Sequence, residues 1–281
     1  MLAGRLGLAL TPLALGACLL LVPIEDDLTS GVGGADGGGD VSDPPDAPPG
    51  DVGADFDSAD AGAGAEGCPS ADPSLVAWFR FDEDGGNVTR DCSRRQVQAR
   101  PLGSTPLRFV AGHTGNALDL ANVCIEVSGS TDYGFEGKPF TVAAWVWIRV
   151  HAMPDRTGRH LVGRHSGSGW HLGSDDPDRG ELDIEHGVDQ KTVTAAAIPS
   201  RAWAHLAATY APGVRMTLFV NGALSHATTS NVPGTIGAAP TQPLRIGCRT
   251  ESTNTFDGLA DDIRIYDRVL SDDEIRALAA D

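Results

Sequence analysis

Residues 256–275, FDGLADDIRIYDRVLSDDEI, contain a strand pattern that runs directly into a helix start. The stretch opens with a Phe-Asp-Gly turn signal, in which glycine adopts positive φ without steric cost. Ile263 and Ile265 share one face of the strand that follows, because strand side chains alternate with a period of two. Arg264 and Tyr266 occupy the other face. A chain with this ending needs an apolar layer that receives the isoleucines.

The residues after this strand form a capping box, which is a signal for a helix N-terminus. Ser271 can accept a hydrogen bond from the backbone N–H of Glu274, and Glu274 can reach back to the N–H of Ser271. Leu270 and Ile275 occupy the two positions of a hydrophobic staple. The pattern predicts a short C-terminal helix that begins after Ser271.

Strand signals recur through residues 68–281, and helix patterns are missing outside the last turns. Residues 140–150 are apolar on both faces apart from Thr141 and Arg149, which is typical of a central strand buried between layers. Many strands without intervening helices predict a single all-β sandwich domain. The other predicted strands are 75–81, 117–120, 124–127, 181–185 with Leu172 before it, 203–210 and 244–247.

A hairpin is predicted between residues 216–220 and residues 223–227. Asn221 and Gly222 lie between these two runs, and Asn-Gly supplies the two positive-φ positions that a type I′ turn requires. The two runs are therefore expected to pair as neighbouring antiparallel strands.

The closing stretch matches the pattern G-L-x-D-[DE]-[IV]-R-[IV]-Y-x-R-x-L-[ST]-x-x-E-I and resembles the closing motif of laminin-G-like domains. These domains belong to the concanavalin A-like group, which also holds the pentraxins. The segments LVAWFRFDED, GHTGNALDL, FTVAAWVWI, RAWAHLAATY, MTLFVNGAL and LRIG follow the order of that family and extend the resemblance over residues 74–279. The resemblance implies a two-sheet antiparallel jelly-roll sandwich with a short C-terminal helix. In pentraxins a disulfide joins two of these strands, and the matching residues here, Ala143 and Ala207, are expected to face each other.

Residues 1–24 are leucine-rich, carry the single charge of Arg5 and are interrupted by Pro12, which predicts an export signal. The sequence LGAC at 15–18 resembles a bacterial lipobox, in which the cysteine is lipidated after cleavage. The resemblance implies a lipoprotein of the outer membrane or cell surface, anchored in the membrane through Cys18. The alternatives are an uncleaved N-terminal membrane anchor and a secreted protein.

Residues 25–67 are dominated by Asp, Gly, Ala and Pro, and Phe56 is their only aromatic residue. Such a segment cannot bury enough apolar surface to offset its ordering entropy, which predicts a disordered acidic tether. Its twelve acidic residues account for most of the formal net charge of −17, and once Arg5 is counted they leave −6 for residues 68–281. No basic patch is visible, so nucleic acid is not expected as a partner.

Lipidation of Cys18 would leave four of the five cysteines. An exported domain folds in an oxidising compartment, so two disulfides are expected. Of the three possible pairings we favour Cys68–Cys92, which would tie the start of the domain to the turn after the first strand, together with Cys124–Cys248. The chain has no CxxC pair and no HExxH sequence, so a zinc site is not predicted.

Glu181, Asp183 and Glu185 alternate with Leu182 and Ile184, so the three carboxylates share one face of a strand. The sequence ELDIE resembles the catalytic strand of lichenase- and laminarinase-type glycoside hydrolases. That resemblance implies Glu181 as nucleophile and Glu185 as acid/base of a retaining mechanism, with Asp183 between them. The alternative is an exposed acidic face without catalysis. We favour the exposed face, because the hydrolase pattern covers only these residues and the laminin-G-like pattern covers the domain.

Trp170 follows a Gly/Ser loop and is the better tryptophan candidate for stacking on a sugar, which adds it to the three carboxylates as a candidate ligand-binding residue. The favoured alternative for Trp170 is packing in the core or at a strand edge. His160, His165 and His171 form a loose cluster and are interpreted as polar loop or strand-edge residues. Apolar neighbours assign three other tryptophans to the core: Trp78, Trp145 and Trp203.

Calcium is an optional cofactor in this interpretation. Pentraxins bind calcium in the loop after the strand equivalent to LRIG, and the loop here offers only Glu251 and Asn254. Asp82, Asp91 and Asp261 are further candidate ligands, because Ca²⁺ needs several hard oxygen atoms.

These features predict an exported, surface-anchored binding or adhesion module for a glycan or an extracellular protein, and not an enzyme. The alternatives are a glycoside hydrolase that uses Glu181 and Glu185, and a structural protein-interaction module.

Overall fold

The computed structural model describes most of the predicted sandwich region. The predicted signal region 1–24 with Cys18, the predicted tether 25–67, and Glu251 and Asn254 lie outside the described residues. Within the described part of the chain, no helix has the length and apolarity needed to cross a bilayer. The described residues are 68, 72–129, 133–149, 159–165, 168–175, 179–186, 189–237, 242–249 and 255–281.

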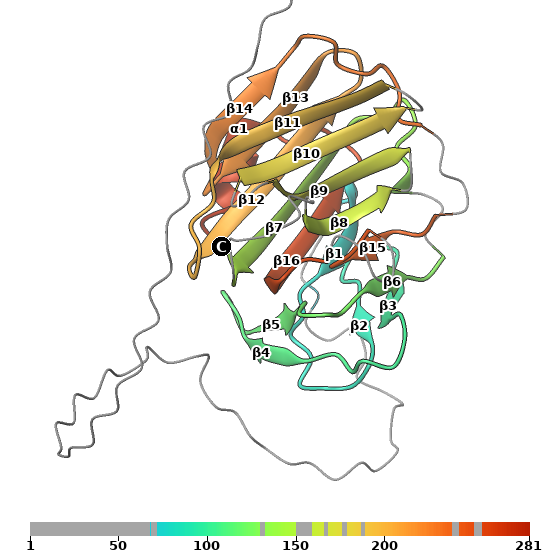
Figure 1. The fold of residues 1–281 in the computed structure, drawn as a ribbon, viewed down its shortest axis with the longest axis vertical. Coiled ribbons are helices and arrows are strands. Elements are labelled where there is room, and N and C mark those ends of the chain that lie inside the picture. Colours follow the sequence, from blue (N-terminus) through green and yellow to red (C-terminus); the bar gives the residue numbers. More distant parts are fainter. Residues whose placement is uncertain are drawn as a thin grey trace, which may run out of the picture. The chain divides into compact units, whose positions relative to one another are not determined.

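The described residues form two eight-stranded antiparallel sheets, packed face to face, and one short helix, α1 (Asp272–Leu278) (Figure 1). This arrangement confirms the predicted two-sheet sandwich. The first sheet, named the β7 sheet, contains β1 (Leu75–Phe79), β4 (Phe109–Ala111), β5 (Asn116–Asp119), β7 (Phe140–Ile148), β12 (Trp203–Ala211), β13 (Arg215–Val220), β14 (Ala223–Thr228) and β16 (Gly258–Tyr266). The second, named the β9 sheet, contains β2 (Thr89–Arg90), β3 (Gln98–Pro101), β6 (Ile125–Val127), β8 (Arg159–His165), β9 (Gly169–Asp175), β10 (Arg179–His186), β11 (Asp189–Ala197) and β15 (Arg245–Ile246).

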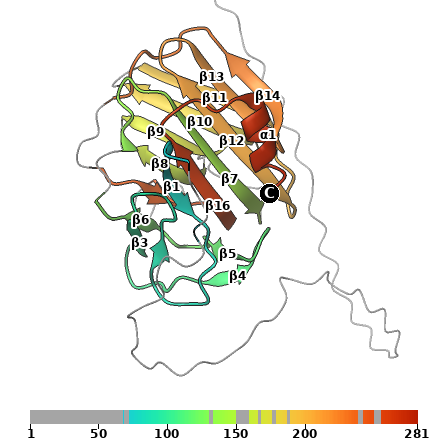
Figure 2. The same ribbon diagram turned by 180° about the vertical axis from the view of Figure 1, so that it is seen from behind.

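Strands that are far apart in the sequence lie side by side in both sheets. The order in the β7 sheet is β14-β13-β12-β7-β16-β5-β4, with β1 also paired to β16. The order in the β9 sheet is β11-β10-β9-β8-β15-β6-β3-β2. Figure 2, seen from behind, shows α1 lying over the outer face of the β7 sheet. The strand order places the closing strand β16 inside its sheet, between β7 and β5.

The core lies between the two sheets. Alternate residues of β7 point into it, and Val142 and Val146 are fully buried there. The rings of Phe140 and Trp170 lie 4.8 Å apart, and the rings of Phe140 and Tyr210 lie 5.6 Å apart. These contacts join the two sheets at their centre, because Trp170 belongs to β9 and the other two residues belong to β7 and β12.

A smaller apolar cluster lies under α1, on the outer face of the β7 sheet. Ala143 and Ala207 are directly opposed across β7 and β12, which confirms their predicted pairing. Their small side chains pack with Leu270 and Ile275, and both of these residues are buried, as the hydrophobic staple predicts. Two alanines at this point therefore leave room for the helix to approach the sheet.

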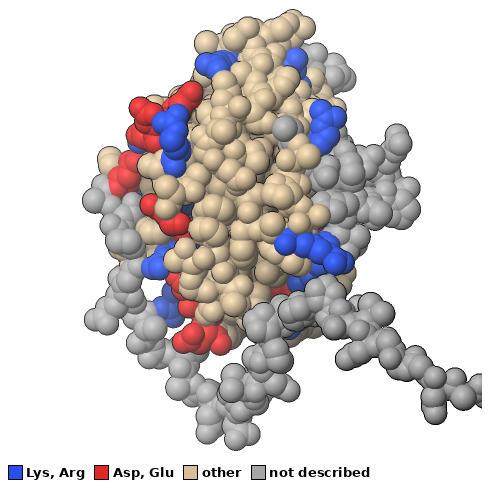
Figure 3. All heavy atoms as spheres, turned by 90° about the vertical axis from the view of Figure 1, so that its left-hand side faces the viewer, with Lys and Arg blue, Asp and Glu red and all other residues tan. Residues whose placement is uncertain are grey.

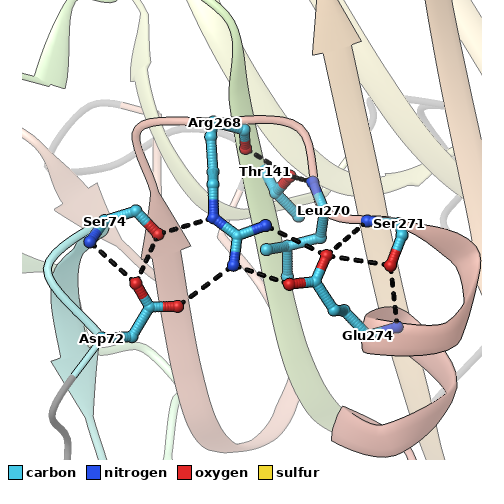
Figure 4. A network of polar contacts seen from close by, with 7 residues as sticks. All are labelled: Asp72, Ser74, Thr141, Arg268, Leu270, Ser271 and Glu274. Carbon is cyan, nitrogen blue, oxygen red and sulfur yellow. Dashed lines mark hydrogen bonds and ion pairs between the residues drawn. The ribbon is translucent and has the colours of Figure 1, made fainter.

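Arg268 links the two ends of the described domain (Figure 4). Its guanidinium donates hydrogen bonds to both carboxylate oxygens of Glu274, at 2.7 and 3.0 Å. It also donates to Asp72 at 3.2 Å and to the hydroxyl of Ser74 at 2.9 Å, just before β1. One side chain thus connects the first turn of α1 with the segment that leads into the first strand.

The predicted capping box is present at the start of α1. The Ser271 hydroxyl accepts from the N–H of Glu274, and a Glu274 carboxylate oxygen accepts from the N–H of Ser271 at 2.7 Å. Thr141 on β7 donates its hydroxyl to the carbonyl of Arg268 at 2.7 Å and accepts from the N–H of Leu270 at 2.9 Å (Figure 4). These bonds hold the turn between β16 and α1 against the central strand.

The type I′ turn is confirmed, because Asn221 and Gly222 both have positive φ, of 50° and 73°. The short strands β2, β3 and β4 and the longer strands β8 and β11 were not predicted. In β8 and β11 the reason lies in their composition. Their residues, RHLVGRH and DQKTVTAAA, carry polar side chains at most of their outward positions and in β8 also a glycine, so neither shows a clear strand signature.

Both predicted disulfides are present. Cys68 pairs with Cys92 over a separation of 24 residues, and Cys124 pairs with Cys248 over a separation of 124 residues. The second bridge joins the turn before β6 to the segment after β15, two neighbouring strands of the β9 sheet.

Replacing Arg268 with alanine is expected to lower the free energy of unfolding by about 1 kcal/mol. The effect is modest because the side chains of Arg268 and Glu274 are 38% and 43% exposed and solvent screens their ion pair. The hydrogen bonds from Arg268 lower the pKa of Glu274 from 4.5 to about 2. The contribution is therefore present above pH 4.5 and is lost as the pH falls toward 2. Urea unfolding at pH 7 and pH 3 measures both effects.

Arg276→Ala is the matched control, because it removes only an ion pair to Asp273 in which both side chains are exposed. It should change the free energy of unfolding by less than about 0.5 kcal/mol. Equal losses in the two variants, or an unchanged acid sensitivity after Arg268→Ala, would contradict the role given to Arg268.

The two disulfides are expected to stabilise the domain unequally. Loop closure in the unfolded chain predicts a loss of about 3.5 kcal/mol when Cys68 and Cys92 are both replaced by alanine, and about 5 kcal/mol when Cys124 and Cys248 are replaced. Equilibrium unfolding in urea without reductant measures both losses. A smaller loss for the Cys124–Cys248 pair would contradict the prediction.

Candidate functional site

Strand β10 places Glu181, Asp183 and Glu185 on the outer face of the β9 sheet, and Leu182 and Ile184 in the core, as the alternation predicts. The carboxylate face is not exposed, so this part of the prediction is wrong. Asp183 is 2% exposed, and the side chains of Glu181 and Glu185 are 12% and 14% exposed. Buried carboxylates need polar partners, because leaving them unpaired out of water is costly.

Three histidines from the neighbouring strands lie against these carboxylates. His171 on β9 is directly between Gly163 of β8 and Asp183 of β10. His160 and His165 come from the two ends of β8. All three histidines are at most 5% exposed, so their interpretation as loop or strand-edge residues is wrong. We name the three histidines, together with Glu181, Asp183 and Glu185, the histidine–carboxylate cluster.

Glycines provide the space for the imidazole rings. Gly163, Gly169 and Gly173 alternate with the histidines on β8 and β9. A Cβ at Gly163 would lie 2.5 Å from the Cβ of His171, so a larger residue there would displace that ring. The rings of His160 and His171 stack with centroids 3.7 Å apart and planes 18° apart. The cluster therefore depends on the pattern of glycine between histidines.

The cluster contains two imidazole–carboxylate contacts with a third carboxylate between them. His171 Nε2 lies 2.8 Å from Glu181 Oε1, within hydrogen-bond geometry. His165 Nε2 lies 2.8 Å from Glu185 Oε2, but within the described residues neither ring nitrogen of His165 has a hydrogen-bond partner. Asp183 Oδ2 is 3.9 Å from His165 Nε2 and 3.8 Å from His171 Nδ1. The Asp183 carboxylate thus lies near a ring nitrogen of both His165 and His171.

Burial controls the ionisation of these groups. It lowers the pKa of all three histidines, and the positive charge of Arg249 lowers them further. Burial also raises the pKa of Asp183, although Thr192 and Gln190 each donate a hydrogen bond of 2.8 Å to its carboxylate. The imidazoles are therefore neutral near pH 7 and keep a lone pair for a proton or a metal ion.

Trp170 does not belong to this surface. Its side chain is fully buried between the sheets, and its indole N–H donates to the carbonyl of Tyr133 at 2.6 Å. In the strand ladder it pairs with Ile184, which also points inward. Core packing, the favoured alternative for Trp170, is therefore confirmed, and Trp170 is ruled out as a ligand-binding candidate because its position in the alternation of β9 turns it toward the core.

The three aspartates considered for calcium do not come together. Asp91 is buried and accepts from the backbone N–H and the hydroxyl of Ser93. Asp82 accepts from the N–H of Asn116 at 3.0 Å. Among the described residues, the close groups of metal-ligand atoms include none of Asp82, Asp91 and Asp261. Calcium binding at these residues stays a prediction.

A second group of aromatic and polar side chains lies on the outer face of the β7 sheet. Trp147 and Trp203 are directly opposed across β7 and β12, and both are half-buried. Trp145 and His205 form the next pair along the same two strands. His113, from the loop between β4 and β5, stacks on Trp145 with ring centroids 3.5 Å apart and planes 11° apart. We name these five residues the aromatic face.

The aromatic face corrects two sequence assignments. Trp145 is buried, as predicted, but it is covered by His113 on the outer face and is not between the sheets. Trp203, also assigned to the core, is half-buried on the same face. The signal that could have located them is the period of two in each strand. In β7 it puts Trp145 on the face opposite to Val146, and in β12 it puts Trp203 on the face opposite to Ala204.

Asp261 holds the loop that carries His113. Its Oδ2 accepts from the backbone N–H of His113 at 2.9 Å and from that of Thr114 at 3.1 Å. Burial raises the pKa of Asp261 to about 7, and these two hydrogen bonds act in the opposite direction. A Cβ at Gly112 would lie 2.7 Å from the same carboxylate oxygen and 2.6 Å from the backbone of Asn116, so glycine is required at that point.

Solved structures with this fold are found at low sequence identity. The binding domain of Paraclostridial Mosquitocidal Protein 1 aligns with a TM-score of 0.61 at 17% identity, covering 73% of this chain and 52% of that one. Domain 4 of AbnA, a GH43 extracellular arabinanase from Geobacillus stearothermophilus, solved with arabinotriose, gives 0.56 at 19% identity, with 73% and 98% covered. The Botulinum neurotoxin serotype G binding domain gives 0.57 at 15% identity, with 73% and 50% covered. The chain thus spans about half the length of the two toxin domains, and these likenesses establish the fold.

No curated protein matches the sequence. A laminin-G family model does match, over residues 122–276, which is more than half of the chain. The match includes β7, both residues of the Ala143–Ala207 pair and the closing strand β16, the elements on which the sandwich is built. The chain therefore belongs to the concanavalin A-like lectin/glucanases superfamily.

Proposed function

We propose that this chain is a carbohydrate-binding module that contacts its ligand with the aromatic face. The observation that carries the proposal is the half-buried pair Trp147 and Trp203, side by side on the outer face of the β7 sheet. Indole rings present a flat apolar surface together with a polar N–H, and sugar rings present matching C–H faces and hydroxyl groups. Two such rings on adjacent strands form a rigid platform.

Polar groups beside the platform would orient the sugar. His113 is half-buried and Thr114 is exposed, and Asp261 holds both in one loop. Binding sites commonly combine an aromatic surface with a few placed polar groups, because the first supplies contact and the second supplies specificity. The arrangement therefore supports a sugar ligand better than a purely apolar one.

The similar structures agree with a binding role. Domain 4 of AbnA was solved with arabinotriose, and the two toxin structures are named binding domains. These proteins are less than a fifth identical to this chain, so they support the class of function and not the particular ligand.

The proposal includes export and tethering. The lipobox-like sequence before Cys18 and the acidic composition of residues 25–67 support a lipid anchor followed by a flexible spacer. A spacer of this kind would let the sandwich reach ligands away from the membrane surface.

The glycoside hydrolase alternative is disfavoured by the surroundings of its two glutamates. Glu181 and Glu185 each contact a different buried histidine, and their side chains are only 12% and 14% exposed. A hollow of about 560 Å³ lies beside the β10–β11 turn, lined by residues that include Lys191 and Asn231 and neither glutamate. A retaining glycosidase needs both carboxylates beside the sugar.

A protein partner is the second candidate, supported by a different surface. Figure 3 shows a broad face in which charged side chains lie mainly at the margins. Strand β14, at the edge of the β7 sheet, carries no charged residue, and Leu224 on it is 51% exposed. An uncharged edge strand is a ready surface for another protein.

Alanine at Trp147 or Trp203 is expected to weaken glycan binding about tenfold or more, because each substitution removes one stacking surface. The full chain, purified in detergent, is tested on an oligosaccharide array that includes arabinotriose and β-glucans, with and without EDTA. Calorimetry with the best array sugar then gives the affinity of each variant. The EDTA arm reports whether calcium is needed.

Leu224→Ala is the matched control for the array experiment, because it removes an exposed apolar side chain on β14, away from the aromatic face. Its affinity should equal that of the wild type. A wild type that binds no glycan would refute the carbohydrate proposal in favour of a protein partner at the β14 edge. Reducing sugar released by the wild type, and lost on Glu181→Gln, would establish the hydrolase instead.

Replacing Cys18 with serine is expected to prevent lipidation, so that the protein leaves the membrane fraction or keeps its signal region. Metabolic labelling with a fatty acid and N-terminal mass spectrometry measure these changes. Cys68→Ser is the control, because it alters a disulfide and should leave the lipid in place. Unchanged labelling and processing of Cys18→Ser would rule out the lipoprotein anchor.

A further inference from the structure

We propose that the histidine–carboxylate cluster is a structural site for a divalent transition-metal ion such as Zn²⁺, which it would bind through His165 Nε2, His171 Nδ1, Asp183 Oδ2 and Glu185 Oε2. No short sequence motif marks it, since the four residues come from β8, β9 and β10. It also lies on the opposite sheet from the aromatic face, so the two proposals are independent.

The distances between the donor atoms fit a small tetrahedral ion. Metal–ligand bonds of about 2.1 Å place neighbouring donor atoms about 3.4 Å apart. Asp183 Oδ2 is 3.9 Å from His165 Nε2 and 3.8 Å from His171 Nδ1. Ligand atoms of His165, Asp183 and Glu185 all lie within 4.8 Å of one another. His171 Nδ1 reaches Asp183 but does not belong to that group of three, so its ring would move toward His165 and Glu185 as the ion binds.

Two of the proposed ligand nitrogens make no well-directed hydrogen bond. His171 Nδ1 and His165 Nε2 are buried and lack a hydrogen-bond partner within the described residues, and both histidines are at most 5% exposed. Such orphaned polar atoms are costly in a protein interior. At 2.8 Å, a ring nitrogen of His165 without its hydrogen would repel the oxygen of Glu185 unless a cation shared the space. A metal ion would satisfy all of these atoms at once.

The surrounding contacts are those of an oriented metal ligand. Ligating histidines commonly donate their second ring N–H to a carboxylate, which fixes the tautomer and the ring orientation. His171 does this with Nε2, which lies 2.8 Å from Glu181 Oε1. Asp183 is fixed in turn by two hydrogen bonds, from Thr192 to its Oδ1 and from Gln190 to its Oδ2, and Oδ2 also faces the histidines.

The charge balance also favours a cation. Glu181, Asp183 and Glu185 carry up to three negative charges, whereas Arg249 supplies one positive charge to the neighbourhood. Because the ligands are buried, the site has the character of a closed structural centre that ties β8, β9 and β10 together.

Metal binding is measured on the full chain, purified in detergent, stripped with chelator and dialysed against Zn²⁺. We expect one Zn²⁺ per chain by elemental analysis, a higher midpoint of thermal unfolding with the metal, and the visible absorption of four-coordinate Co²⁺ when cobalt replaces zinc. His171→Gln and Asp183→Asn should weaken binding more than about 100-fold, and Glu181→Gln, which removes only the orienting carboxylate, about tenfold. Competition with a chelating dye gives these affinities.

His226→Gln is the control, because His226 is exposed on β14 of the other sheet. It should bind Zn²⁺ as the wild type does. Circular dichroism shows which variants are folded. A folded His171→Gln or Asp183→Asn with unchanged affinity would overturn the proposal. If those variants do not fold, the wild type provides the test. A folded, stripped wild-type chain that gives no four-coordinate Co²⁺ spectrum on addition of cobalt would also overturn the proposal.

Discussion

The pairing of β16 with β7 is the constraint on which the rest of this structure depends. The last strand of the chain sits in the middle of its sheet, with β7 on one side and β5 and β1 on the other. The sheet is therefore incomplete until the C-terminus has arrived, and contacts of such long sequence separation are slow to form. Once β16 is paired, hydrogen bonds hold the turn that follows it. Arg268 donates to Asp72 and Glu274, and Thr141 accepts from the N–H of Leu270.

The two outer faces of the sandwich differ in how their side chains are covered and paired. On the β7 sheet, α1 covers Ala143 and Ala207, and the uncovered remainder presents the aromatic face. On the β9 sheet, polar residues are buried, and glycines leave the space in which imidazole rings and carboxylates contact one another. The proposed ligand site lies on the first face, where Trp147 and Trp203 are partly accessible. The second suits an ion because its donor atoms are enclosed.

Most of the architecture could be read from local patterns. The capping box at Ser271, the turn at Asn221 and the alternation around Ile263 each depend on neighbouring residues only, and each is present in the structure. Strands β8 and β11 escaped detection because their partners, and not their own composition, make them strands. The same limit explains Trp170, since β9 was indicated only by Leu172 and its bounds, and so the face that Trp170 occupies, had no clear local signal.

The candidate sites show the same difference between what local sequence predicts and what strand pairing determines. The period of two in ELDIE was enough to place Glu181, Asp183 and Glu185 on one face. Their burial and their contacts with His165 and His171 follow from the register of β8, β9 and β10, which is set by pairings between strands and by the core beneath them. Local sequence determines which side of a strand a residue takes, whereas only the packed sheet decides which residues it meets there.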